Sequence, residues 1–341
     1  MPSVLVTGGA GFIGSHLVDA LVAQGQRVRV LDDFSTGKWE NLERHRAAIT
    51  VLEGDVRDRE TVRRAVQGCE VVFHEAAIAS VPLSFEQPEL VLDVNVAGTG
   101  NVLEAARAAG ARRRIFASSC AVYGDPAELP VPETAPLQPG SPYAESKLAG
   151  ETACREATAR GELECVCLRY FNVFGPRQDP SSDYSGVIAR FAEAARRGAP
   201  CTVYGDGGQT RDFVYVADVV RANLLATTCA LHGGEPVNVG SGVETSVLDI
   251  VRALEIATGR SPARSSERSL ARPLEVLHLP ARQGDVRRSL ASTEVARREL
   301  GFAAALSFVD GLRATLGEDL SGEGLRGASL AGEGVAERPA T

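Results

Sequence analysis

A glycine-rich turn near the start of the chain constrains its fold more than any other feature of the sequence. The apolar run Val4–Val6 leads into Gly8, Gly11 and Gly14, and an amphipathic segment follows them. This pattern predicts a buried strand, a tight turn and a helix. Glycines allow the backbone to approach a pyrophosphate, which binds the amide groups of a helix N-terminus. Because the spacing is G-x-x-G-x-x-G rather than G-x-G-x-x-G, the turn alone is equally consistent with an ordinary strand-to-helix connection.

An acidic residue follows the second predicted strand at the distance expected of a dinucleotide-binding unit. Asp32 lies about 20 residues after Gly14, directly behind the apolar segment 28–31. A carboxylate there accepts hydrogen bonds from the adenosine ribose, and its charge repels the 2′-phosphate of NADP. The sequence therefore favours NAD, although the same acid is also typical of a turn or a helix cap.

Strand-like and helix-like segments alternate over the first half of the chain. Strands are expected at 28–31, 49–52, 70–73 and 114–117, and helices at 58–67, 89–109 and 142–160. This alternation is typical of a parallel sheet covered on both faces, with ligands bound at the carboxyl ends of the strands. We therefore expect an α/β fold, a Rossmann-type doubly wound parallel sheet.

The elements become shorter after about residue 170. Strands are expected at 165–170, 212–215 and 236–239, and helices near 185–197, 216–229, 246–258 and 306–316. We expect residues 1–170 to form an NAD-binding domain to which segments near 212–240 return. Residues 171–211 and 241–317 are expected to form a smaller, discontinuous substrate-binding lobe. The segment 318–341 has almost no apolar residues to bury and is predicted to be a disordered tail.

Composition argues against several functional classes. The net charge of −8 and the pI near 5.3 do not favour a nucleic-acid or anionic-membrane surface. No run approaches the ~20 apolar residues of a membrane span, and no signal peptide precedes Val4, so we expect a cytoplasmic protein. The seven cysteines are scattered without C-x-x-C spacing, which indicates reduced thiols. We predict no metal site.

Two further stretches contain candidate catalytic residues. Ser119 follows the fifth predicted strand, and Tyr143 opens the next helix with Lys147 four residues later, on the same face. An ammonium group beside a phenol favours the phenolate and is expected to lower the pKa of Tyr143 from about 10 towards neutrality. A positively charged nicotinamide would act in the same direction. We therefore predict Tyr143 as a general base, with Ser119 bridging its phenol and a substrate hydroxyl.

Taken in chain order, these motifs resemble those of the extended short-chain dehydrogenases/reductases, in the group of nucleotide-sugar epimerases and dehydratases. The matching segments span roughly residues 3–316 and are Thr7–Gly14, Asp32, Gly54–Val56, His74–Ala77, Asn95–Thr99, Ser118–Gly124, Tyr143 with Lys147, Arg169–Gln178, Gly205–Phe213, Asn238–Gly242 and Arg282–Val286. The resemblance implies a tightly held NAD, a UDP-sugar in the cleft between the lobes, and a homodimer formed through the helices at 89–109 and 142–160.

The resemblance also implies which residues contact the ligands, with Ser119, Tyr143 and Lys147 as the catalytic residues. The residues implied for NAD are Gly8, Gly11, Phe12, Ile13, Gly14, Asp32, Asp33, Ser35, Thr36, Gly37, Asp55, Val56, Ala76, Ala77, Ala79, Asn95, Ser118, Tyr143, Lys147, Tyr170 and Val173. Those implied for the UDP-sugar are Ser80, Val81, Ser119, Cys120, Tyr143, Asn172, Val187, Ile188, Phe191, Tyr204, Arg211, Arg282, Asp285 and Ser289. Arg211 and Arg282 would bind the diphosphate, for which a guanidinium suits bidentate contact.

The residue types at two positions distinguish which reaction a member of this group catalyses. The related 4,6-dehydratases have an Asp-Glu pair after the serine or threonine, because eliminating water requires a further acid and base. Here those positions are Cys120 and Ala121, so dehydration is disfavoured. The resemblance therefore implies reversible 4-epimerisation of a UDP-hexose through a 4-keto intermediate. A catalytically inactive NAD-binding sensor on the same fold is the remaining alternative, and the joint presence of Ser119, Tyr143 and Lys147 argues against it.

The identity of the sugar depends on a few residues of the second lobe. In related epimerases the residue seven positions after the second arginine faces the C2 substituent of the sugar, and here it is the small Ser289. UDP-GlcNAc/UDP-GalNAc is therefore expected as substrate beside UDP-Glc/UDP-Gal. UDP-glucuronic acid is the alternative. Uronic-acid epimerases of this family tend to have a threonine in place of Asn172 and, for the C6 carboxylate, an arginine in place of Asp179. Both residues therefore speak against this substrate, since the acid at 179 would repel the C6 carboxylate. Arg177 could bind that group instead.

Overall fold

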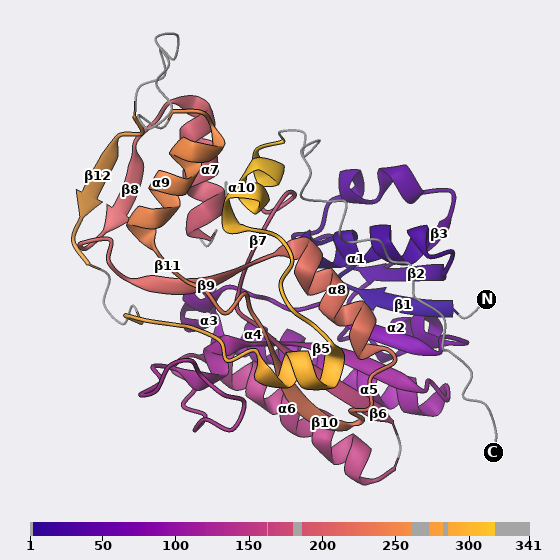
Figure 1. Cartoon of the computed structure of the whole chain (residues 1–341). Coiled ribbons are helices and arrows are strands. Elements are labelled where there is room, and N and C mark those ends of the chain that lie inside the picture. The colour runs from indigo at the N-terminus through magenta and orange to yellow at the C-terminus, as the bar shows by residue number, and fades with distance from the viewer. Residues whose placement is uncertain (1–2, 162, 180–185, 261–272, 282–285, 318–341) are drawn as a thin grey trace, which may run out of the picture.

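The computed structural model describes residues 3–161, 163–179, 186–260, 273–281 and 286–317. The predicted tail over 318–341 lies outside these ranges. Within them, the chain forms a large α/β unit and a smaller group of elements, β8, α7, α9 and β12, at one side of it (Figure 1). No helix of the described part of the chain combines the length and the apolar character that crossing a membrane requires.

The large unit is built on a seven-stranded sheet in which all paired strands are parallel. Its order is β10-β6-β5-β4-β1-β2-β3. The strands are β1 (Ser3–Thr7), β2 (Arg27–Asp32), β3 (Ile49–Glu53), β4 (Val71–His74), β5 (Arg113–Ser119), β6 (Glu164–Tyr170) and β10 (Gly233–Val239). The direction of strand succession reverses between β1 and β4, which is where doubly wound sheets bind dinucleotides. The predicted fold class is confirmed.

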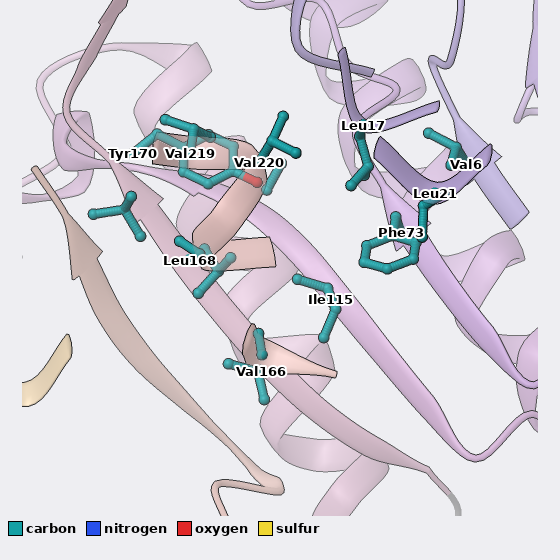
Figure 2. Packing of buried hydrophobic residues seen from close by; sticks show 14 of the residues in the cluster. Val6, Leu17, Leu21, Phe73, Ile115, Val166, Leu168, Tyr170, Val219 and Val220 are labelled. Carbon is teal, nitrogen blue, oxygen red and sulfur yellow. The ribbon is translucent and has the colours of Figure 1, made fainter. Parts of the chain in front are cut away.

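Helices cover both faces of this sheet. On one face, α1 (Phe12–Ala23) and α8 (Val216–Ala226) bury Leu17, Leu21, Val219 and Val220 against strand residues such as Val6 (Figure 2). On the other, α2 (Arg59–Val66), α5 (Gly98–Ala108) and α6 (Pro142–Ala159) share a second core with the opposite side chains of the strands. Because both faces are buried, strand side chains of both orientations are apolar.

The predicted helix at 89–109 is a continuous helical run that contains a π-helical turn. It comprises α4 (Pro88–Leu92), a π-turn (Asp93–Ala97) and α5. The turn widens at Asn95, whose amide bonds to the backbone of Ile78 and to the Ser146 hydroxyl of α6. Extra π-turns of this kind are frequent at functional sites.

The smaller group of elements, together with the neighbouring elements of two short sheets and a further helix, forms a smaller lobe with its own core. One sheet joins β7 (Asn172–Phe174), β9 (Thr210–Tyr215) and β11 (Glu244–Ser246), and the other pairs β8 (Cys201–Tyr204) with β12 (Val276–Leu279). Residues of α7 (Val187–Arg197), α9 (Val247–Ala257) and α10 (Phe308–Leu316) pack on them. Within the predicted returning segment 212–240, α8 and β10 join the large unit, whereas β9 pairs with β7 and β11. The predicted boundaries between the NAD-binding domain and the substrate-binding lobe therefore stay a proposal.

Candidate active site

The glycine turn between β1 and α1 admits no larger side chains at two of its positions. Gly8 has a φ of +68°, a conformation that favours glycine, and its amide donates to the Leu31 carbonyl at 2.8 Å. A Cβ on Gly8 would lie 2.7 Å from the Ala76 nitrogen, and one on Gly14 would lie 2.1 Å from the Gly8 oxygen. The glycines therefore allow the turn to pack closely against itself and against residues 75–76, which brings the N-terminus of α1 up to the end of β1, where dinucleotide-binding folds hold a pyrophosphate.

Asp32 is held beside this turn at the carboxyl end of β2. One carboxylate oxygen accepts from the Ala10 amide at 2.8 Å and the other from the Phe34 amide at 2.9 Å. Burial nevertheless raises the pKa of Asp32. Gly37 lies against it, since a Cβ there would be 2.6 Å from the Asp32 Oδ1. The turn and the acid, far apart in sequence, thus form one cradle whose shape and charge fit NAD.

Other residues predicted for NAD lie after β2 and β3 and in the π-turn between α4 and α5. Asp33 accepts from the Ser35 amide and hydroxyl at 3.0 and 2.7 Å. Asp55 forms an ion pair with Arg57 at 2.5 Å. The Asn95 amide donates to the Ile78 carbonyl at 3.0 Å and accepts from its amide at 2.8 Å. Asn95 therefore fixes Ile78, which lies between Ala77 and Ala79, two residues predicted to contact NAD.

A cavity of about 720 Å³ opens beside this cradle, between the carboxyl ends of β5 and β6 and the smaller lobe. Ligand pockets typically have this size. Of the predicted residues, it is lined by Phe12, Ile13, Ala79, Ser118, Ser119, Tyr143, Tyr170, Asn172, Val173, Val187, Ile188, Phe191, Tyr204 and Arg211. The structure thus brings together residues predicted for the cofactor, for the substrate and for catalysis.

The lining also contains residues that the sequence analysis did not select. They are Phe171, Phe174, Gln178, Gly186, Arg190, Ala194, Pro200, Thr202, Gln209, Phe213, Val247 and Leu279. Arg190 and Ala194 lie on the face of α7 that also carries Val187 and Phe191. Their helical spacing is present in the sequence and is the signal that could have identified them.

The candidate catalytic residues come from β5 and the first turns of α6. Ser141 caps this helix by accepting from the Ala144 amide at 3.2 Å, and Pro142 occupies its first position. Lys147 donates to the Ala117 carbonyl of β5 at 2.8 Å, and its Nζ lies 5.8 Å from the ring centroid of Tyr143. Both side chains are buried, so their interaction is only weakly screened.

The prediction that neighbouring side chains lower the pKa of Tyr143 is wrong. Burial raises the pKa of Tyr143 to about 12, and a hydrogen bond with Ser119 only partly opposes this shift. Burial also lowers the pKa of Lys147 to about 8. Desolvation of the phenolate is therefore the dominant effect on the pKa of Tyr143. A positive charge on bound cofactor is the remaining influence that would favour the phenolate.

Several predicted substrate residues do not line the cavity. Ser80 caps α3 (Val81–Glu86) by accepting from the Leu83 amide at 3.1 Å, and Val81 begins that helix. Cys120 begins a short 3₁₀ turn, and burial raises the pKa of its thiol to about 12. Ser289 lies one residue beyond Arg288, which pairs with Glu244. Arg282 and Asp285 lie outside the described residues.

Arg177 and Asp179 are engaged with the large unit rather than the cavity. Arg177 pairs with Asp19 of α1 at 2.6 Å, and Asp179 pairs with Lys38 at 3.0 Å. The Lys38 amide also donates to the Ala10 carbonyl of the glycine turn at 3.0 Å. The segment after β7 is thereby tied down next to the cofactor cradle.

Comparisons with known proteins agree with this geometry. Residues 4–240 match the model of the NAD dependent epimerase/dehydratase family. The chain is 41% identical over 318 residues to a UDP-glucose 4-epimerase of Mycolicibacterium smegmatis, an alignment that covers 92% of this chain and 96% of the relative.

Solved structures show the same similarity. The UDP-glucose 4-epimerase of Thermus thermophilus in complex with NAD is 40% identical, with a TM-score of 0.81 over 92% of this chain and 98% of that one. The UDP-N-acetylglucosamine 4-epimerase of Methanobrevibacter ruminantium, in complex with UDP-N-acetylmuramic acid, is 34% identical, with a TM-score of 0.85 over 93% and 97%.

Proposed function

Because the chain belongs to the NAD-dependent epimerase/dehydratase family, we propose that it reversibly converts the two 4-epimers of a UDP-hexose into each other. The observation that carries the proposal is the placement of Tyr143 and Ser119 in the wall of a cavity that adjoins the cofactor cradle, with Lys147 buried behind them. A non-catalytic sensor would not require this arrangement. The names of the similar proteins support the same class of reaction.

Each candidate catalytic residue has its own role in the proposed reaction. Tyr143 takes the proton of the sugar 4-hydroxyl, and Ser119 orients that hydroxyl through its hydrogen bond with the phenol. Lys147, fixed by the Ala117 carbonyl, supplies the positive charge that favours the phenolate. NAD, when bound, supplies the acceptor for the hydride and returns it. A sugar held mainly through its nucleotide can then present either face, and the cavity offers room for this rotation.

Epimerisation is favoured over dehydration because neither of the two positions that follow Ser119 carries a carboxylate. The thiol of Cys120 stays neutral, since burial raises its pKa to about 12, and Ala121 has no functional group. Elimination of water would need a further acid and base at this point.

We assign the nucleotide to the part of the cavity formed by the smaller lobe. Arg211 of β9 lines the cavity and is the cation that we assign to the diphosphate. Asn172 of β7 also lines the cavity, and its amide donates to the carbonyl of the neighbouring Asp212 at 3.2 Å. Val187, Ile188, Phe191 and Tyr204 form the apolar part in which a base would be buried. Arg282 and Asp285 remain predicted contacts.

We propose UDP-Glc/UDP-Gal and UDP-GlcNAc/UDP-GalNAc as the substrates, on account of the names of the similar proteins. The small Ser289 supports this choice only through the family resemblance, since it does not line the cavity. UDP-glucuronic acid is disfavoured. Arg177, the cation that could have replaced a dedicated carboxylate-binding residue, is bound to Asp19 and does not line the cavity. We also propose a homodimer through the helical run 88–108 and α6, near which Phe85 is 62% exposed.

The deciding experiment incubates the purified protein with UDP-Glc, UDP-GlcNAc and UDP-GlcA and follows the 4-epimers by NMR. We expect turnover of the first two. The Tyr143→Phe variant should lose about 10²- to 10⁴-fold in rate, because general base catalysis contributes this much. Turnover of UDP-GlcA alone would contradict the substrate assignment. A dehydrated sugar product, or unchanged turnover by Tyr143→Phe, would contradict the proposed reaction.

A further inference from the structure

A buried carboxylate next to the proposed diphosphate contact joins three separate segments of the chain. Asp212 of β9 directly follows Arg211 and is fully buried. Its Oδ1 accepts from the amide and from the hydroxyl of Ser241, each at 2.7 Å. Its Oδ2 accepts from the Gly242 amide at 2.9 Å and from the Ala291 amide at 3.2 Å. Asp212 thus connects β9 with the segment after β10 and with the segment that contains Ala291.

These four contacts need a side chain that only accepts hydrogen bonds. Three of the donors are backbone amides, and they are divided between the two carboxylate oxygens. An asparagine has one acceptor oxygen, so in either orientation its amide nitrogen would face at least one backbone amide. The backbone also lies close to the carboxylate, since a Cβ on Gly240 would be 2.7 Å from the Asp212 Oδ2. The site therefore fits an ionised aspartate.

The backbone of Asp212 is linked to two side chains in the wall of the cavity. Arg211 precedes it and lines the cavity, and the Arg211 Nη1 donates to the Thr210 carbonyl of the same strand at 2.8 Å. Asn172 of β7 also lines the cavity, and its amide donates to the Asp212 carbonyl at 3.2 Å. A shift of β9 at Asp212 would therefore move both side chains.

The partners of Asp212 are themselves attached to the large unit. The segment with Ala291 is bound on both sides, because the Val131 amide donates to the Leu290 carbonyl at 2.8 Å and the Ser292 amide donates to the Val131 carbonyl at 3.0 Å. The side chain of Asn238, in β10, donates to the same Val131 carbonyl at 2.9 Å. Asp212 thus ties β9, which belongs to the smaller lobe, to backbone that is held by the seven-stranded sheet.

We propose that Asp212 is a positioning residue that fixes Arg211 and Asn172 in the cavity wall and thereby determines how tightly the diphosphate of the substrate binds. Asp212 itself does not line the cavity, so it acts through these two residues. The inference rests on the proposed function, because it assumes that a UDP-hexose occupies the cavity.

The proposal predicts a loss of substrate binding rather than of chemistry. In Asp212→Asn an amide nitrogen faces a backbone donor, so the junction opens and β9 shifts. Contacts to the diphosphate are made equally in the ground state and in the transition state, and their loss raises KM and leaves kcat largely unchanged. We expect KM to rise by about tenfold, because a misplaced guanidinium loses charged hydrogen bonds. The content of bound NAD should not change, since β1 and β2 carry the glycine turn and Asp32.

The test measures kcat and KM for the turned-over UDP-hexose in the holoenzyme and in two variants, Asp212→Asn and Ser241→Ala. Ser241→Ala removes one hydroxyl contact and keeps the three amide contacts, so it should raise KM in the same direction by less. It decides the question if Asp212→Asn does not fold.

The matched control is Asp218→Asn. Asp218 of α8 is a buried aspartate that also accepts from two backbone amides, those of Ala305 and Leu306, at 3.0 and 3.4 Å. It does not line the cavity. Asp218→Asn should lower the stability of the protein and leave KM unchanged. An equal rise of KM in Asp218→Asn would show that loss of stability, rather than displacement of Arg211 and Asn172, explains the effect, and would overturn the proposal.

A second readout does not depend on turnover. The binding of UDP to each holoenzyme is measured by isothermal titration calorimetry, and its Kd should rise with KM in Asp212→Asn and Ser241→Ala. Unchanged KM and Kd in these variants, or a loss confined to kcat, would overturn the proposal. If the wild type turns over no UDP-hexose, the proposed function fails, and the UDP titration still decides the role of Asp212. A wild type that does not bind UDP would overturn both.

Discussion

Glu151 of α6 and Arg169 of β6 form a bidentate ion pair that is sealed from solvent. The Arg169 Nε and Nη2 lie 2.8 and 2.7 Å from the two carboxylate oxygens, and neither side chain is more than 1% exposed. The Ser118 hydroxyl donates to the same carboxylate at 2.6 Å. Since Ser118 precedes Ser119 and Glu151 lies one turn after Lys147, this pair fixes both elements that carry the candidate catalytic residues.

Replacing Glu151 by Ala should therefore destabilise the protein strongly. It leaves a buried guanidinium without its carboxylate, which costs about 3–5 kcal/mol in the free energy of unfolding. Urea unfolding followed by circular dichroism measures this loss. The control is Arg155→Ala, which removes a 3.7 Å contact to the same carboxylate from a side chain that is 41% exposed. It should cost less than about 1 kcal/mol. Equal effects of the two variants would contradict the importance assigned to the buried pair.

Alanine substitutions of Gly14, in the glycine turn, and of Gly100, in α5, should have opposite effects on stability. In Gly14→Ala the new methyl group would lie 2.1 Å from the Gly8 oxygen, a backbone atom that cannot move without deforming the cradle. We expect a loss of about 1–3 kcal/mol in stability and a lower content of bound NAD. Gly100, in α5, has open space around it, so Gly100→Ala should stabilise the protein by about 0.5–1 kcal/mol. Thermal unfolding and the NAD absorbance of the purified proteins measure both effects. Normal NAD content in Gly14→Ala would show that the turn does not hold the pyrophosphate.

Glu244 gives a prediction about acid stability. Arg288, at 2.7 Å from both carboxylate oxygens, lowers the pKa of Glu244 to about 2. The folded-state pKa lies below the unfolded value, so this contribution to stability is fully present above about pH 4.5 and is lost as the pH falls towards 2. Glu244→Gln should cost less than about 1 kcal/mol near neutrality, because Arg288 is 57% exposed. Unfolding by urea at a series of pH values should show this difference shrinking below about pH 4.5. A difference that grows on acidification would contradict the assignment.

The ion pair between Lys38 and Asp179 should slow the release of NAD. Lys38 bonds through its amide to the glycine turn, and Asp179 lies in the segment that follows β7. We therefore expect that breaking the pair loosens the chain next to the cofactor cradle. The side chains of Lys38 and Asp179 are 53% and 39% exposed. The ion pair should therefore contribute only about 0.2–1 kcal/mol to the barrier for NAD release, or up to about fivefold in the release rate. This contribution should become smaller in high salt. NAD exchange measured with labelled cofactor in Lys38→Ala, Asp179→Asn and the double variant tests this. Additive effects of the two single variants would show that the pair does not act as a unit.

The sequence was a good guide wherever local pattern decides the structure. The glycine turn, Asp32 and the spacing of Tyr143 and Lys147 depend on neighbours in the chain, and the structure places them as the pattern indicates. The π-turn at Asn95 was not predictable in this way, because it depends on contacts with Ile78 and Ser146. The raised pKa of Tyr143 likewise depends on burial by the whole fold. The pairing of Arg177 with Asp19 joins residues 158 positions apart, and no local signal indicates it.

The identity of the sugar can be tested at Ser289. This residue follows Arg288, whose ion pair with Glu244 ties the segment to β11, and it precedes Ala291, whose amide donates to Asp212 at 3.2 Å. The segment is therefore held by contacts on both sides of residue 289. To make room for a larger residue there, the segment would have to move and break one of these contacts. If Ser289 leaves room for a C2 N-acetyl group, Ser289→Tyr should lower kcat/KM for UDP-GlcNAc by about tenfold or more relative to UDP-Glc, because excluding a small group in a pocket is worth about 1–3 kcal/mol. Ser289→Ala is the matched control and should leave the ratio unchanged. Equal losses on both substrates in Ser289→Tyr would show that this position does not determine which sugar is accepted.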